Sequence, residues 1–179
     1  MRRVVTNTGP LSHLQEAGVL DLMSLTGEVH LPPSVAQEIA YLLPSWRSPS
    51  WLQVVDALAV PYAEEALTWQ QAGLLDAGEA EAIALARQLR ADWLLTDDAA
   101  ARLVAQSLGI EVRGSLGVVL WAAAVGHLDR PRAEAALDGL ARSSLWISAR
   151  VLREARSALD RLCSPGARDP LSRGASHTS

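Results

Sequence analysis

The sequence predicts an α/β fold in which helices cover both faces of a parallel sheet. Short apolar runs that end in turn residues alternate along the chain with longer segments of helical periodicity, the pattern of βαβ units. At 179 residues the chain fits one domain of ordinary size. We expect a single domain over 1–162, followed by a disordered tail over 163–179 that is polar and rich in Gly, Pro and Ser.

In the first part of the chain, turn residues and prolines separate the predicted elements. Asn-Thr-Gly-Pro ends the first apolar run, and Pro32-Pro33 stops another. Ser34 and Gln37 have the spacing of a capping box at the start of a helix. We expect a strand at 3–6, a helix from Leu11 to Gly18, a short helix at 19–25, a strand at 28–31, a helix at 34–42, a loop at 44–51, a strand at 52–60 and a weaker helix at 63–72.

In the second part of the chain, glycines mark helix ends and small or rigid residues mark helix starts. Gly109 and Gly126 end two helices, Ser115 caps one, and Pro131 suits the first turn of another. We expect a strong helix at 77–90, a strand at 92–96, a helix at 99–108, a strand at 110–112 and helices at 115–125, 131–142 and 148–162.

Composition and charge exclude several classes of protein. The net charge of −4 gives no sign of bulk affinity for nucleic acids, so any RNA contact needs a local arginine patch. The single cysteine, Cys163, excludes an internal disulfide and a Cys-based metal site. No apolar run is long enough for a signal peptide or for the roughly 18 residues of a membrane-spanning helix. We therefore expect a cytoplasmic protein without a membrane partner.

Polar residues follow two of the predicted strands. Asn7, the only asparagine of the chain, ends the strand at 3–6, and Thr96-Asp97-Asp98 follows the strand at 92–96. The chain contains no lysine, and its composition indicates a GC-rich coding bias that also disfavours asparagine. Because binding sites of parallel sheets form where strand C-termini meet helix starts, we expect these residues to line a site.

Two glutamates lie on the apolar faces of their own helices. Glu38 is three residues after Val35, within a stripe that continues at Ile39. Glu79 extends the stripe of Ala82 and Ile83 toward the start of its helix, whereas Glu81 lies off that stripe. An ionised carboxylate on a core-facing stripe is costly unless it is paired or binds a cation.

Carboxylates and one amide are thus expected to converge at the C-terminal edge of the sheet. Clustered carboxylates repel one another, and a hard divalent cation such as Mg²⁺ or Mn²⁺ relieves that repulsion. Such an ion can polarise a phosphoryl oxygen and lower the pKa of a bound water. The four histidines show no metal-ligand spacing, and the sequence contains no Gly-rich phosphate loop.

Each of these residues also has a purely structural interpretation. Asp97 and Asp98 can simply cap the helix at 99–108, Glu79 can be a solvated first-turn residue, and Asn7 can be an ordinary turn residue. The arginines of the last helix can contact RNA phosphates, but a solvated face is favoured. Trp46 and Trp51 can anchor a partner or face the core.

The order of five segments resembles PIN-domain proteins of the branch that opens with Asn-Thr instead of Asp-Thr. The segments are "VVTNTGPL", "LPPSVAQEI", "LDAGEAEAIALA", "LLTDDAAARLVAQSLGIEVRGSLGVVL" and "SSLWISARVLREA", and the resemblance covers about 3–162. It implies a three-layer α/β/α sandwich with a central parallel sheet. It also implies an Mg²⁺- or Mn²⁺-dependent ribonuclease, as in VapC-type toxins of toxin–antitoxin pairs.

The resemblance also implies roles for individual residues. The first acidic position of the family falls on Asn7, the second on Glu38, the third on Glu79 and the fourth on Asp98. Asp97 would help to bind the metal, with Thr96 and Ser115 as supporting residues. Two departures from the family pattern bear on catalysis. Asn7 offers a neutral carbonyl where most active relatives have a carboxylate, and Gly9 replaces a residue that is often a hydroxyl.

Three functions remain open on the sequence. The first is a metal-dependent endoribonuclease in which Glu38, Glu79 and Asp98 are catalytic, with RNA as substrate, a small antitoxin as partner and a homodimer as the assembly. The second is a PIN-like scaffold with weakened chemistry that binds RNA or a partner protein. The third is another metal-dependent phosphatase or nucleotide-binding α/β domain.

Overall fold

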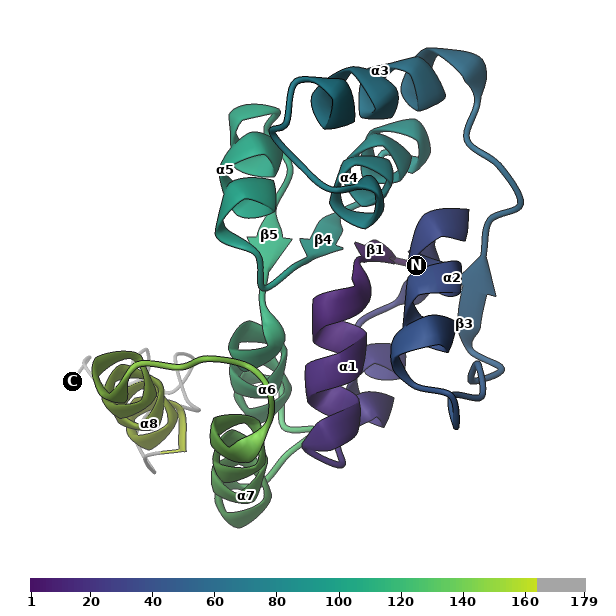
Figure 1. Ribbon diagram of the computed structural model, residues 1–179. Helices are drawn as coiled ribbons and strands as arrows, with labels where there is room; N and C mark the ends of the chain where they lie inside the picture. The colour runs from purple at the N-terminus through teal and green to yellow at the C-terminus, as the bar shows by residue number, and fades with distance from the viewer. Residues whose placement is uncertain (164–179) are drawn as a thin grey trace, which may run out of the picture.

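The computed structural model describes residues 1–163. The predicted tail over 163–179 lies outside the described residues, except for Cys163, which is the last residue of the last helix. Within the described residues, the chain forms a central sheet with helices on both faces (Figure 1). The predicted α/β/α sandwich is therefore confirmed.

The sheet has five strands, and every neighbouring pair is parallel. Its strand order is β3-β2-β1-β4-β5. The first strand of the chain is therefore the central one, with neighbours on both sides. The strands are β1 (Arg3–Thr6), β2 (Glu28–Leu31), β3 (Leu52–Val54), β4 (Trp93–Leu95) and β5 (Val112–Arg113).

The helices form two layers, one on each face of the sheet. In Figure 1, α3, α4 and α5 lie above the strands, whereas α1, α6 and α7 lie below them. The helices are α1 (Thr8–Glu16), the 3₁₀ helix η1 (Leu20–Leu25), α2 (Pro33–Leu42), α3 (Val60–Gln71), α4 (Ala77–Leu89), α5 (Ala99–Ser107), α6 (Ser115–Ala124), α7 (Arg130–Arg142) and α8 (Ala149–Cys163).

Alternation along the central strands divides the core between the two faces. Val4 and Val5 are both fully buried, but Val4 packs with α1, α2 and α6, whereas Val5 packs with α4 and α5. In β4, Leu95 belongs to the first cluster and Leu94 to the second. Because successive side chains of a strand point to opposite faces, two apolar clusters hold one sheet from both sides.

Several predicted boundaries were wrong. The strand expected at 52–60 is only β3, and α3 begins at Val60 because Pro61 fits a helical first turn. Pro10 likewise lies in the first turn of α1, so that this helix starts directly after Asn7 and not at Leu11. The short helix over 19–25 is 3₁₀ in form.

Two predicted helix caps were also wrong, and both are replaced by carboxylates from other elements. The N-cap position of α2 is Pro32, and no side-chain hydrogen bond caps the start of this helix, so the capping box predicted for Ser34 and Gln37 is not formed. Instead, Glu81 of α4 accepts a hydrogen bond from the Ser34 N–H at 3.1 Å. Ser115 is the first residue of α6, and its N–H donates to Asp97 at 2.7 Å. Charged acceptors at helix N-termini satisfy backbone donors and complement the helix dipole.

No helix among residues 1–163 is both long enough and apolar enough to cross a membrane.

Candidate active site

The candidate site lies at the C-terminal edge of the sheet, beside the central strand. β1 and β4 are adjacent and parallel, so Asn7 and Thr96 follow neighbouring strand ends. The strand order changes direction between them, since β2 and β3 extend the sheet on one side and β4 and β5 on the other. Open parallel sheets form binding sites at this kind of position.

A pocket of about 410 Å³ opens at this edge of the sheet. All five residues that were predicted as metal ligands line the pocket, although they come from separate segments of the chain. They are Asn7, Glu38, Glu79, Asp97 and Asp98. The two supporting residues, Thr96 and Ser115, are fully buried and hydrogen-bond to these lining residues. The structure thus brings the whole predicted set together.

Asn7 is held at the base of the pocket by its side-chain amide. Its Nδ2 donates to Thr96 Oγ1 at 2.8 Å, and the same hydroxyl accepts from the Asp98 N–H at 3.2 Å. Asn7 Oδ1 is buried and has no hydrogen-bond partner within the described part of the chain. A buried polar oxygen without a partner is costly, so it marks a place where a ligand can supply the missing interaction.

Glu38 reaches the pocket from the inward face of α2. Its Oε2 accepts a hydrogen bond from Thr8 Oγ1 at 2.6 Å. Gly78 of α4 lies directly opposite, and a Cβ added there would be 2.8 Å from that same oxygen. The absence of a side chain at Gly78 therefore leaves room for the Glu38 carboxylate between the two helices.

Glu79 combines a structural role with a place in the pocket. Its N–H donates to Asp76 Oδ1 at 2.8 Å and its Oε2 accepts from the Asp76 N–H at 3.1 Å, which is a complete capping box. Burial, with the nearby charges of Asp76 and Asp98, raises the pKa of Glu79 to about 7. Glu79 is thus a first-turn residue, as its structural interpretation predicted, but it is half-buried and not solvated. Its carboxylate changes its charge near neutral pH.

Glu79→Gln is expected to stabilise the metal-free protein at about pH 8 and to change little at about pH 4. The pKa of Glu79 in the folded state is raised from the ordinary 4.5 to about 7. The stability that the protonated Glu79 side chain contributes is therefore fully present below pH 4.5 and is lost as the pH rises through 7. Glutamine keeps the capping box. The gain at about pH 8 should be on the order of 1 kcal/mol, because solvent screens this half-buried group.

Urea denaturation of parent and variant across this pH range, in a chelator, measures the effect. A constant difference between the two proteins at every pH would contradict the raised pKa.

Asp98 and Asp97 have different partners. Asp98 Oδ1 accepts from the Ala101 N–H at 2.7 Å, so Asp98 caps α5, as its structural interpretation predicted. Asp97 does not cap that helix. Its Oδ1 accepts from the Ser115 N–H, and its Oδ2 is bound by Ser115 Oγ at 2.5 Å and by His13 Nδ1 at 2.7 Å. Burial opposes the charge of Asp97, but these hydrogen bonds hold its pKa below the usual value.

Sequence reasoning missed several residues of the pocket, including His13, Gly78 and Trp146. His13 lies one helical turn after Gly9 on α1, and that spacing was the available signal. Gly78 and Trp146 gave none, because their importance depends on which distant segment lies opposite them.

The donor atoms of the pocket suit a hard divalent cation in their chemistry. Carboxylate and amide oxygens are the ligands that Mg²⁺ and Mn²⁺ favour, and Asn7 Oδ1 offers an unpartnered one. Among residues 1–163, however, no three His, Cys, Asp or Glu side chains are already arranged to hold a metal ion.

The other sequence candidates lie mainly in structural settings. Trp93 is buried and packs edge-on against the half-buried Trp121, with ring centroids 5.5 Å apart. Trp46 and Trp51 are half-buried against the core. The arginines of α8 are exposed, and two of them pair with acids, Arg150 with Glu154 and Arg156 with Asp138.

A parallel α/β/α sandwich with acidic residues around a pocket at its strand C-termini has the architecture of a nuclease fold. A model of the PIN-domain family DUF3368 matches residues 3–161, and the chain belongs to this PIN-domain family. PIN domains are generally metal-dependent ribonucleases that bind RNA. No curated protein shows significant similarity to the chain.

Proposed function

We propose that the chain is a metal-dependent endoribonuclease of the VapC type, the toxin of a toxin–antitoxin pair, which hydrolyses RNA phosphodiester bonds. The observation that carries the proposal is the buried, unpartnered Asn7 Oδ1 in a pocket that Glu38, Glu79 and Asp98 also line. Such an oxygen beside clustered carboxylates is favourable when a cation binds among them.

In this proposal Glu38, Glu79 and Asp98 are the catalytic carboxylates, and Asn7 completes the ligand set. A bound Mg²⁺ or Mn²⁺ would polarise the phosphoryl oxygen and lower the pKa of a water. Thr8 orients Glu38 through its hydroxyl, and the Ala101 N–H holds one oxygen of Asp98. Asp97 organises the pocket from behind, because both of its oxygens already accept hydrogen bonds from protein donors.

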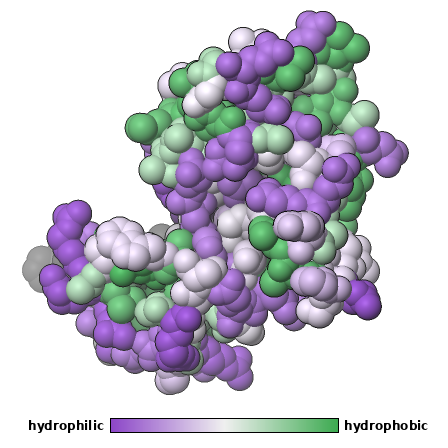
Figure 2. All heavy atoms as spheres, in the orientation of Figure 1, coloured by the Kyte–Doolittle hydropathy of each residue, from purple (hydrophilic) through white to green (hydrophobic). Residues whose placement is uncertain are grey.

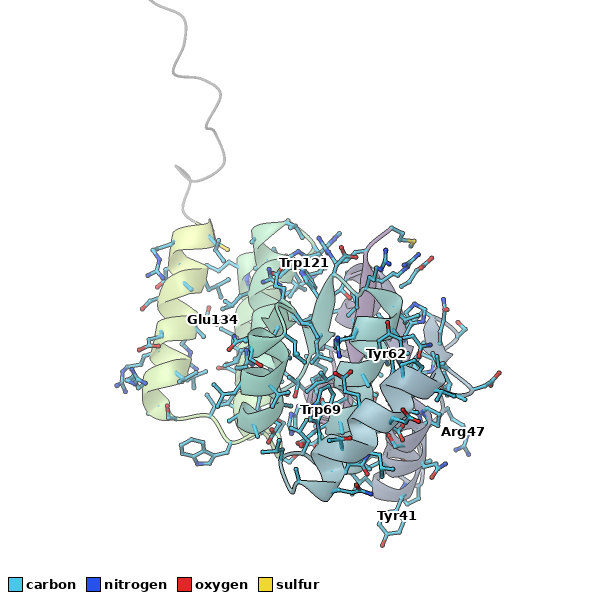
Figure 3. All side chains as sticks on the ribbon, turned by 90° about the horizontal axis from the view of Figure 1, so that it is seen from above. Tyr41, Arg47, Tyr62, Trp69, Trp121 and Glu134 are labelled. Atoms are coloured by element: carbon cyan, nitrogen blue, oxygen red, sulfur yellow. The ribbon has the colours of Figure 1, made fainter. Side chains whose placement is uncertain are left out.

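The toxin setting adds a small antitoxin and a homodimer to the proposal. An edge strand of the sheet and exposed apolar side chains at the end of α2 support an interface. β3 is the edge of the sheet, with Val54 48% exposed. Tyr41 projects from the end of α2 (Figure 3), and its neighbour in the sequence, Leu42, is 52% exposed. Uncovered strand edges readily pair with other chains.

A scaffold that binds RNA without cleaving it is the second candidate. Two observations favour it: Asn7 supplies no charge, and no three acidic or histidine side chains in residues 1–163 are already gathered for a metal. A carboxylate contributes a full charge to a cation, whereas an amide contributes only a dipole.

Cleavage of RNA by the purified chain with Mn²⁺ separates the two candidates. We expect cleavage with Mn²⁺ and none in a chelator. Asn7→Asp should bind Mn²⁺ at least about ten-fold more tightly, because it adds a charge, and should cleave as fast as the parent or faster. Without metal it should be less stable than the parent, since neighbouring acids disfavour its ionisation. Asn7→Ala should lose activity.

Calorimetric titration with Mn²⁺ gives the affinities. Equal affinities of the parent and Asn7→Asp would remove Asn7 from the site. RNA binding without cleavage by the parent, at any Mn²⁺ concentration, would favour the scaffold.

A further inference from the structure

Trp146 differs from the other tryptophans in its exposure. Its side chain is 86% exposed, whereas the other five are half-buried or buried. A large aromatic side chain that is exposed to water gains nothing for the stability of the fold. It lies in the short connection between α7 and α8, and it lines the acidic pocket.

The backbone on either side of Trp146 is fixed. Leu145 and Ile147 pack against the apolar core, so that the segment alternates between inward and outward side chains. The N–H and hydroxyl of Ser144 donate to the Glu16 carboxylate of α1 at 2.5 and 2.7 Å. The exposed ring is therefore presented on an anchored segment, which lowers the entropy lost when a ligand binds it.

A second pocket of about 370 Å³ adjoins the acidic one, with Asp97, Leu145 and Trp146 in the wall of both. Its other side carries Arg102 and Arg113, and it lies between α5 and α8. The surface in Figure 2 is indented between the parts of the molecule formed by these two helices. Trp146 thus separates an acidic pocket from one that contains two arginines.

The two arginines differ in how many donors they keep for a ligand. Arg113 pairs with Glu111 at 2.6 Å and lies 4.2 Å from the centroid of the Trp93 ring. Arg102 donates to the Thr96 carbonyl at 3.1 Å and forms no ion pair with an acid among residues 1–163. Since a guanidinium has five donors, Arg102 can still bind an anionic oxygen.

We propose that Trp146 stacks on an unpaired nucleobase of RNA next to the cleaved bond, while Arg102 binds a phosphate of the same strand in the adjoining pocket. The proposal rests on the proposed ribonuclease function and adds two residues that would bind the substrate strand outside the acidic pocket's ligand set. Exposed aromatic rings beside basic grooves are the usual means by which proteins bind single strands. An exposed tryptophan can also anchor a protein partner, but the adjoining Arg102, which forms no ion pair with an acid among residues 1–163, favours a phosphate backbone.

Binding of a single-stranded oligoribonucleotide of about ten nucleotides, measured by fluorescence anisotropy in a chelator, tests the proposal. Trp146→Ala should weaken binding by about five- to one-hundred-fold, and Trp146→Phe should keep most of it. Arg102→Gln should reduce the slope of log K against log salt by about 0.7. Val60→Ala is the control, because Val60 is 68% exposed at the start of α3 and lines neither pocket.

The outcomes are distinguishable. Unchanged affinity of Trp146→Ala overturns the stacking proposal, and if the parent cleaves RNA, the proposed function stands. A small protein partner retained by the parent but lost by Trp146→Ala, with RNA affinity unchanged, overturns it in favour of protein docking. If a duplex of the same sequence binds as tightly as the single strand, the proposal that Trp146 stacks on an unpaired nucleobase is overturned. A parent that neither binds nor cleaves RNA overturns the proposed function as well.

Discussion

Replacing Glu38 with glutamine is expected to reduce Mn²⁺-dependent RNA cleavage by at least about 100-fold. Glutamine has nearly the same volume and keeps an oxygen that can accept the 2.6 Å hydrogen bond from Thr8 Oγ1. Only the charge is removed, so the loss of cleavage rate measures how much the negative charge of Glu38 contributes to catalysis. Rates of cleavage of a labelled RNA by parent and variant measure it.

The same variant should separate the metal site from the fold. Without metal, Glu38→Gln is expected to melt at a higher temperature than the parent, because one of the mutually repelling carboxylates is neutral. Mn²⁺ should raise the melting temperature of the parent and not that of the variant, since a ligand of the folded state alone stabilises it. Glu134→Gln, an exposed change on α7, is the matched control (Figure 3). Equal melting of the parent with and without Mn²⁺ would contradict a metal site.

The second large effect is expected for Asp97→Asn, which should lower the free energy of unfolding by about 2 kcal/mol. The carboxylate accepts hydrogen bonds from the Ser115 N–H, the Ser115 hydroxyl and His13. An asparagine presents an NH₂ group to one of these donors, so at least one buried donor loses its partner. Urea denaturation at neutral pH measures the change.

Two comparisons sharpen this second prediction. Ser115→Ala removes one of the three donors to Asp97, so it should cost less, about 1 kcal/mol. Since the pKa of Asp97 in the folded state is below its usual value, its contribution is present above that value and is lost as the pH falls through the lower one. The deficit of Asp97→Asn should therefore shrink in acid. A variant as stable as the parent at neutral pH would show that Asp97 does not organise the pocket.

The order of strands and helices could be predicted because local chemistry determines most of it. Asn-Thr-Gly-Pro after β1 and the glycines after α5 and α6 are strong local signals. The errors arose where a distant residue took over a local task. Ser34 cannot be recognised as capped by Glu81 from the sequence, because the two meet only when α2 and α4 pack together. The length of β3 likewise depends on its single neighbour, β2.

The candidate site was predictable in its acids and not in their surroundings. Glu38 and Glu79 were conspicuous because a carboxylate on an apolar stripe violates the helical pattern. Trp146 violates no pattern, since its exposure is a property of the folded connection between α7 and α8. The role of His13 as a hydrogen-bond partner of Asp97 could not be predicted, because the two residues meet only in the folded structure.

The link between Ser144 and Glu16 has a consequence for biosynthesis. A ribosome that has released residues 1–113 has supplied every strand of the sheet and all the acids of the pocket. The wall formed by Ser144, Leu145 and Trp146 is still missing at that stage, because these residues have not yet been synthesised. They are fixed to α1 only when Ser144 hydrogen-bonds to Glu16. Nascent chains fold from their N-terminus as they emerge. The pocket is therefore completed only after Trp146 has emerged, well after the sheet and the acidic residues are in place.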